Sequence, residues 1–156
     1  MGPLTIDASV FVRSMSPEEN GHGECVQLIE RAGAARVPVV LPVLALIELA
    51  AGLARRRVPE PLMRELLGRM RQMPLLTLVP LDEALMEETV DVVVSTRTHG
   101  ADSVYVAVAR RYGSTLVTLD EEQRIRAPKG IEALRPDQAL GELEARWSTG
   151  SGRSRI

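Results

Sequence analysis

Short apolar runs alternate along the chain with longer segments in which apolar residues recur every three or four positions. An unbroken apolar run is typical of a buried strand, and a repeat near 3.6 residues is typical of a helix. The runs that predict strands are residues 4–6, 37–41, 75–79, 115–119 and, at an edge of the sheet, 131–134. Because helical segments separate them, we expect an α/β fold: a three-layer α/β/α sandwich with a mainly parallel central sheet.

Caps and breakers predict where the helices begin and end. Serine, aspartate and proline favour helix starts, and glycine favours the position after a helix. The helices are expected to run from Ser16 or later through Ala32, from Pro42 to about Arg56, after Pro61 up to Pro74, from Asp82 to about Thr98, from Asp102 or Ser103 to Gly113, and from Pro136 to about Trp147. With no repeat or linker in between, residues 1–147 are expected to form one domain, and the Ser/Gly/Arg-rich residues 148–156 a disordered tail.

Composition narrows the classes of function. The hydrophobic fraction of 45% supports a packed core, and 21 acidic against 19 basic residues exclude a polybasic, histone-like binder. The single cysteine, Cys25, excludes an internal disulfide framework, and 3% aromatic residues are too few for a base-stacking platform. No signal peptide or membrane-spanning stretch is visible, so we expect a cytoplasmic protein without a membrane partner.

Three aspartates stand where the predicted elements would bring them to one edge of the sheet. Asp7 follows the first strand, Asp120 follows the fourth, and Asp102 starts the helix that leads into the fourth. In open α/β sheets, ligands bind beyond the carboxyl ends of the strands, where the winding of the chain reverses. Taken singly, each aspartate also has an ordinary structural explanation as a turn former or helix N-cap.

Glu48 stands out because it lies on an apolar helix. Its neighbours one turn away are Leu44, Ala45, Ala51 and Gly52, and no lysine or arginine lies within one turn. An isolated buried carboxylate is costly, and a bound cation would remove the cost; a half-exposed helix face is the structural alternative. Four converging carboxylates suit a hard divalent cation, which activates water for phosphodiester hydrolysis.

Four segments carry these acids and resemble the PIN domain, most closely the VapC-like toxin ribonucleases of prokaryotic toxin–antitoxin pairs. The segments are residues 5–10 (TIDASV), 46–53 (LIELAAGL), 100–109 (GADSVYVAVA) and 116–120 (LVTLD). The resemblance spans about residues 4–135. It implies a PIN-like nuclease domain, in which a parallel sheet lies between helices, and an endoribonuclease that depends on Mg²⁺ or Mn²⁺.

The same resemblance assigns roles to individual residues and implies partners. Asp7, Glu48, Asp102 and Asp120 would form the catalytic, metal-binding cluster, with Ser9 and Thr118 as supporting hydroxyls. Thr118 is also a good strand former. The toxins of the family usually form dimers and are silenced by a small antitoxin protein. An RNA substrate, a homodimer and a small antitoxin are therefore the expected partners.

Three arginines are candidates for binding RNA phosphates. Arg13 follows the Asp7 segment closely, and Arg55 and Arg56 follow the Glu48 helix. A solvated helix C-terminus explains Arg55 and Arg56 equally well. Without the four candidate ligands, 17 acidic residues face 19 basic ones, so the rest of the chain is slightly basic.

Other functions fit parts of the same pattern. A PIN-domain nuclease of RNA processing would carry the same acids without being a toxin. An aspartyl phosphatase with Asp7 as nucleophile would usually have a second acid two residues later, where Ser9 stands, and the only lysine is Lys129. A non-catalytic module that binds RNA or protein is the remaining alternative, and the presence of all four acids argues against it.

Overall fold

The central feature of the protein is a five-stranded sheet in which all neighbouring strands are parallel. The computed structural model describes residues 2–150, with side chains to residue 145. The strands are β1 (Leu4–Ile6), β2 (Val39–Pro42), β3 (Leu76–Val79), β4 (Thr115–Val117) and β5 (Ala133–Leu134). Their order across the sheet is β3-β2-β1-β4-β5, which confirms the expected parallel α/β architecture.

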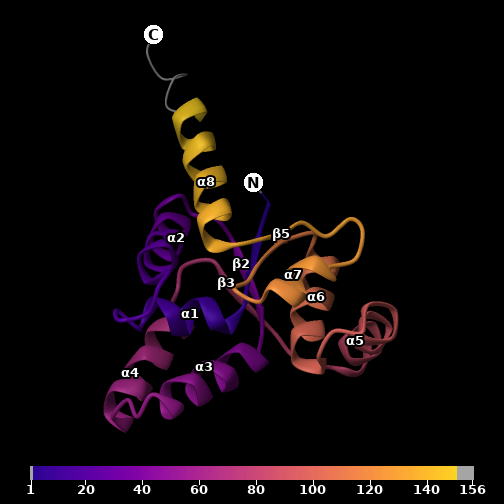
Figure 1. The fold of residues 1–156 in the computed structure, drawn as a ribbon, viewed down its shortest axis with the longest axis horizontal. Helices are drawn as coiled ribbons and strands as arrows, with labels where there is room; N and C mark the ends of the chain where they lie inside the picture. Colours follow the sequence, from indigo (N-terminus) through magenta and orange to yellow (C-terminus); the bar gives the residue numbers. More distant parts are fainter. Residues whose placement is uncertain (1, 151–156) are drawn as a thin grey trace.

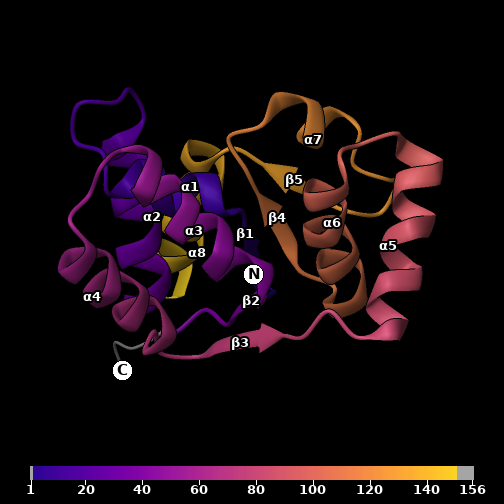
Figure 2. The same ribbon diagram turned by 90° about the horizontal axis from the view of Figure 1, so that it is seen from below.

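Helices cover both faces of this sheet. They are α1 (Ala8–Ser14), α2 (His22–Ala34), α3 (Leu44–Arg55), α4 (Glu60–Arg71), α5 (Glu83–Thr96), α6 (Gly100–Tyr112), α7 (Glu121–Ile125) and α8 (Pro136–Gly150). Figures 1 and 2 show α5 and α6 on one side of the sheet and α1, α2 and α8 on the other. The predicted three-layer sandwich is therefore confirmed, with α6 packed directly on β1, β2 and β4.

The inner strands form the core of the sheet. Every residue of β1, β2 and β4 is buried, whereas the edge strands β3 and β5 are partly exposed. This pattern is expected for parallel strands that have helices on both faces. The chain passes from β1 outward to β2 and β3, and then crosses to β4 and β5 on the other side. The reversal of winding consequently falls between β1 and β4, as expected from the sequence.

Several helix boundaries differ from those the sequence predicts. Helix α1 is absent from the predicted elements; Asp7 caps it, and Val10, Phe11 and Val12 are buried against the core although such residues favour strands. Helix α2 begins at His22 and not near Ser16, since the preceding glycine has a left-handed φ of 84°.

The ends of two further elements also differ. Pro42 ends β2 and does not open the next helix. Helix α8 extends to Gly150, three residues beyond its predicted end at Trp147. Of the predicted disordered tail, residues 148–150 belong to α8, and residues 151–156 lie outside the described part of the chain. Within residues 2–150, no helix combines the length and the apolar character that crossing a membrane requires.

Helices α1 and α3 approach each other closely at Gly52. A Cβ atom placed on Gly52 would lie only 2.6 Å from Cγ2 of Val12, a buried side chain of α1. Glycine in a helix interior is ordinarily unfavourable, so its presence here reflects the close contact between the helices. The helix that carries Glu48 is thereby fixed against the helix that Asp7 caps.

We expect Gly52→Ala to lower the free energy of unfolding by about 1–3 kcal/mol, because the added methyl group overpacks the contact with Val12. Urea unfolding measures this change. Gly68→Ala is the matched control, since nothing lies within 4 Å of a Cβ at that position of α4. The control should raise stability by up to about 1 kcal/mol through helix propensity. Equal gains in both variants would contradict the steric explanation.

Candidate active site

The adjacent ends of β1 and β4 bring two aspartates to the same edge of the sheet. Ile6 pairs in register with Val117, and the Asp7 N–H donates to the Val117 carbonyl at 2.9 Å. Asp7 caps α1, and its Oδ1 accepts a hydrogen bond from the Ser9 N–H at 2.8 Å. Asp120 follows β4, caps α7 and accepts from the N–H of the third residue after it at 2.9 Å. Both capping carboxylates are thus held by backbone donors.

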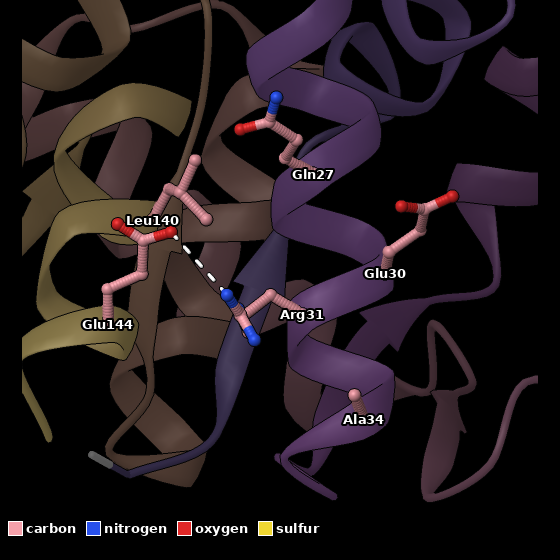
Figure 3. A pocket seen from close by; sticks show the side chains of 6 residues that line it. All are labelled: Gln27, Glu30, Arg31, Ala34, Leu140 and Glu144. Carbon is pink, nitrogen blue, oxygen red and sulfur yellow. Dashed lines mark ion pairs between the residues drawn. The ribbon is translucent and has the colours of Figure 1, made fainter. Parts of the chain in front are cut away.

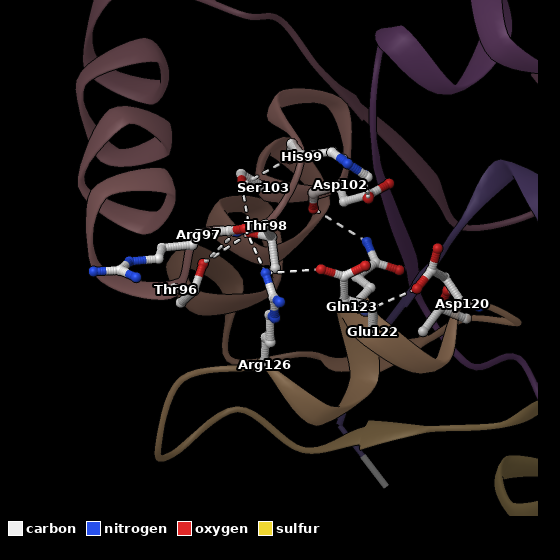
Figure 4. Close-up of polar contacts among 11 residues, drawn as sticks. Thr96, Arg97, Thr98, His99, Asp102, Ser103, Asp120, Glu122, Gln123 and Arg126 are labelled. Atoms are coloured by element: carbon white, nitrogen blue, oxygen red, sulfur yellow. Dashed lines mark hydrogen bonds and ion pairs between the residues drawn. The ribbon is translucent and has the colours of Figure 1, made fainter.

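Asp102 reaches this edge from the first turn of α6. Its side chain is 25% exposed, and His99 Nδ1 lies 3.5 Å from its Oδ2. The main-chain carbonyl of Asp102 accepts a hydrogen bond from Nε2 of Gln123 at 3.1 Å. Figure 4 shows Gln123 between Asp102 and Asp120, in contact with both residues. The start of α6 is therefore tied directly to α7.

Glu48 has a hydrogen-bond donor that the sequence analysis did not identify. The hydroxyl of Tyr105 donates to Glu48 Oε2 at 2.5 Å, and Tyr105 is among the largest fully buried side chains. Tyr105 lies one turn after Asp102 on α6, a spacing that places both on one helix face and could have indicated it. The half-buried carboxylate of Glu48 thus has a phenol as its partner in place of a basic residue.

The four acids influence one another electrostatically. Burial is the main cause that raises the pKa of Asp7, of Glu48 and of Asp102. Repulsion adds to it: the charge of Asp120 raises the pKa of Asp7 and of Asp102, and the charge of Asp7 raises the pKa of Glu48. Hydrogen bonds from Ser9 and Tyr105 act in the opposite direction. Each of the four carboxylates therefore lies close enough to at least one other for their negative charges to repel.

A cleft of about 280 Å³ opens beside these acids. Its lining residues are Asp7, Ala8, Ser9, Val12, Arg13, Glu48, Arg55, Arg56 and Asp102. Two of its arginines share one acidic partner: Glu19 lies 2.9 Å from Arg13 Nε and 2.5 Å from Arg56 Nη2. The three arginines singled out in the sequence therefore border the acidic cluster, as a phosphate-binding role requires.

The two predicted supporting hydroxyls differ in their contacts. Thr118 is fully buried, and its Oγ1 accepts from the Asp120 N–H at 3.0 Å, so it fixes the backbone of Asp120 and not a carboxylate. Ser9 Oγ is buried and has no hydrogen-bond partner among residues 2–145. Because it lies beside Asp7, this hydroxyl is available to a ligand or water at the acidic cluster.

The donor set fits a hydrated, hard divalent cation. Within the described side chains, no three Asp, Glu, His or Cys residues come close enough to hold a metal ion by themselves. Mg²⁺, however, is usually bound by one or two carboxylates and keeps several waters. Carboxylates with raised pKa values and the unpartnered Ser9 hydroxyl suit such an ion, for which Asp7, Glu48, Asp102 and Asp120 are the candidate ligands.

Another hollow, of about 250 Å³, lies between α2 and α8 (Figure 3). Its lining residues are Gln27, Glu30, Arg31, Ala34, Leu140 and Glu144. Arg31 and Glu144 form an ion pair across it, with a distance of 3.7 Å between Nη2 and Oε1. This arrangement joins two helices and includes none of the four candidate acids.

Comparisons with known proteins agree with this architecture. The family model of the PIN domain matches residues 4–128, whereas no curated protein matches the sequence. The structure of PAE2754 from Pyrobaculum aerophilum has a TM-score of 0.66 and 20% identity, covering 92% of this chain and 96% of its own.

Two toxin structures are similarly close in fold. VapC20 from Mycobacterium tuberculosis, a sarcin–ricin loop cleaving toxin, has a TM-score of 0.65 and 17% identity, covering 83% of this chain and 98% of its own. A toxin–antitoxin complex from Klebsiella pneumoniae has a TM-score of 0.62 and 15% identity, covering 85% and 97% respectively. At these identities, the likeness establishes a shared fold.

We expect Asp7→Asn to stabilise the metal-free protein at pH 7, because the amide removes a buried charge and its oxygen still accepts from Ser9. The folded pKa of Asp7 is raised, so its contribution to wild-type stability is fully present below the unfolded pKa of about 3.9 and is lost as the pH rises through the folded value. Urea unfolding at pH 4 and pH 7 should show that the free energy of unfolding of Asp7→Asn exceeds that of the wild type by more at pH 7 than at pH 4. The exposed Asp91→Asn on α5 is the control, and a pH-independent advantage of Asp7→Asn would refute the explanation.

We expect Tyr105→Phe to raise the pKa of Glu48 further, because the phenol donor that stabilises the carboxylate is lost. The free energy of unfolding should fall by about 1.5–3 kcal/mol, the usual contribution of a hydrogen bond to a charged group. An NMR pH titration of the Glu48 carboxyl measures the shift. Tyr112→Phe, in the last turn of the same helix and 41% exposed, should leave Glu48 unchanged. An identical pKa of Glu48 in Tyr105→Phe and Tyr112→Phe would disprove the hydrogen bond between Tyr105 and Glu48.

Proposed function

The chain belongs to the PIN domain family, and on this premise we propose that it is a Mg²⁺- or Mn²⁺-dependent endoribonuclease, the toxin of a toxin–antitoxin pair. PIN domains are generally nucleases. The observation that carries the proposal is the convergence of Asp7, Glu48, Asp102 and Asp120 at the edge where β1 meets β4, in a shared negative field. Like charges of this kind gather at considerable electrostatic cost, which a bound cation would offset.

One or two of the four carboxylates would bind the cation directly and the others through its waters, and neighbouring groups would keep them in place. When bound, a divalent cation lowers the pKa of a water molecule and stabilises negative charge on the phosphate. Ser9 fixes Asp7 through its N–H, and Tyr105 fixes Glu48 through its hydroxyl. The raised pKa of Glu48 also makes its carboxyl suited to accept and release a proton at the cleft.

The arginines at the cleft would bind the RNA backbone. Arg13, Arg55 and Arg56 line the same cavity as the acids, so phosphates flanking the reacting one would meet positive charge. Glu19 bridges Arg13 and Arg56 and holds their guanidinium groups as a pair. An acidic centre with a basic border is suited to a polyanionic substrate that must approach bound cations.

Two protein partners belong to the proposal. The Klebsiella pneumoniae structure with the same fold is a toxin–antitoxin complex, which supports a small antitoxin as a partner. A homodimer is supported by an apolar groove of about 280 Å³ along α5. One apolar stripe of this helix is exposed to solvent and consists of Met86, Val90 and Val94; Val94 is 75% exposed. Exposed apolar patches of this kind mark surfaces for protein contacts.

We expect Asp102→Asn to reduce Mn²⁺-dependent cleavage of a single-stranded RNA by about 100-fold or more, because the metal contributes several kcal/mol to stabilising the transition state. A gel assay with fluorescently labelled RNA measures the rate, and circular dichroism checks that the variant is folded. Asp91→Asn on α5 is the matched control and should retain full activity. Undiminished cleavage by folded Asp102→Asn would overturn the proposed function.

A further inference from the structure

Gln123 is a buried polar side chain in contact with the acidic cluster. It lies on α7 and is 1% exposed. Its main-chain N–H donates to Asp120 Oδ1 at 2.9 Å, and its side-chain Nε2 donates to the Asp102 main-chain oxygen at 3.1 Å (Figure 4). Gln123 therefore contacts two of the four acidic positions, Asp102 at the start of α6 and Asp120 at the start of α7.

The orientation of the Gln123 amide follows from its partner. The Asp102 main-chain oxygen can only accept a hydrogen bond, so the NH₂ group must face it. The other end of the amide, Oε1, is consequently directed elsewhere; it is buried and has no hydrogen-bond partner within the described part of the protein. A buried, unsatisfied carbonyl lowers stability, and an apolar side chain of equal size would avoid this cost. Packing alone therefore does not explain a glutamine at this position.

A second contact fastens α7 independently of Gln123. Arg126 Nη1 donates to the Arg97 main-chain oxygen at 2.7 Å and lies 2.7 Å from Glu122 Oε1. This contact joins the end of α7 to the connection between α5 and α6, at the protein surface (Figure 4). The short helix is thus attached even without the Gln123 amide. Gln123 adds a contact at the N-terminal end of α7, next to the cap residue Asp120.

We infer that Gln123 is a positioning residue, which fixes Asp102 and Asp120 relative to each other so that they can bind a divalent cation together. The inference rests on the proposed function, since it concerns the same site. Metal ligands must be held within about 0.5 Å of their productive places, and groups that orient them typically change metal affinity 10- to 100-fold. Asp120 is an exposed N-cap at the start of a five-residue helix, so its place depends on how that end of α7 is attached.

The test is Gln123→Met, which keeps the length of the side chain and removes the amide. Calorimetry with MnCl₂ and no RNA should show a dissociation constant raised about 10- to 100-fold. The melting temperature should be unchanged or higher, because the unsatisfied carbonyl is lost. Cleavage of single-stranded RNA should recover at saturating Mn²⁺. Arg126→Met, which removes the other attachment of α7, is the control and should bind Mn²⁺ as the wild type does.

The outcomes separate this inference from the proposed function. A wild-type protein that neither binds Mn²⁺ nor cleaves RNA overturns both. If the wild type binds Mn²⁺ and cleaves RNA, and folded Gln123→Met binds Mn²⁺ with the same affinity as the wild type, only the role of Gln123 is overturned. If Gln123→Met does not fold, Gln123→Leu is measured in the same way, and failure of both to fold shows a structural role and overturns the inference. Gln123→Met in an Asp102→Asn background should cause no further loss of affinity.

Discussion

The parallel pairing of β1 with β4 is the constraint on which the site depends. Ile6 lies opposite Val117, and the Asp7 N–H extends the ladder by one more bond to the Val117 carbonyl. A shift of one residue would turn Asp7 to the other face of the sheet and separate it from Asp120. The same register places two helix starts side by side, so both carboxylates act as caps and as members of one charged cluster. Helix α6 then completes the cluster because it packs on both strands.

The protein maintains this cluster against an electrostatic cost. Burial and mutual repulsion disfavour the ionised carboxylates, and their raised pKa values record that effect. The compensation is local: a backbone N–H at Asp7, a phenol at Glu48 and the His99 ring beside the Asp102 carboxylate. The charge of Arg55 also lowers the pKa of Glu48. The arginines are kept at the border of the cleft, where Glu19 pairs two of them. Such a trade of stability for chemistry is common at active sites.

Much of this arrangement could be predicted from the sequence, because strand order and capping follow from local patterns. The apolar runs before Asp7 and Asp120 indicate that both follow strands, and the apolar neighbours of Glu48 indicate a helix, as the structure has them. Helix α1 could not be predicted, because the cap at Asp7 and burial of its apolar side chains outweigh the strand preference of its residues. Tyr105 and Gln123 were missed for a different reason. Their hydrogen bonds join residues 57 and 21 positions apart, and a local pattern such as the spacing of Tyr105 after Asp102 indicates a helix face but not the partner.

The close contact between Gly52 and Val12 has a consequence for how the site can adjust. It leaves no room between α1 and α3, so Asp7 and Glu48 are carried by one rigid unit. Asp102 and Asp120 are carried by α6 and α7, which the Gln123 amide joins, while Arg126 attaches α7 to the end of α5. The four acids therefore come from two separate pairs of helices, and an ion bound among them would join these pairs.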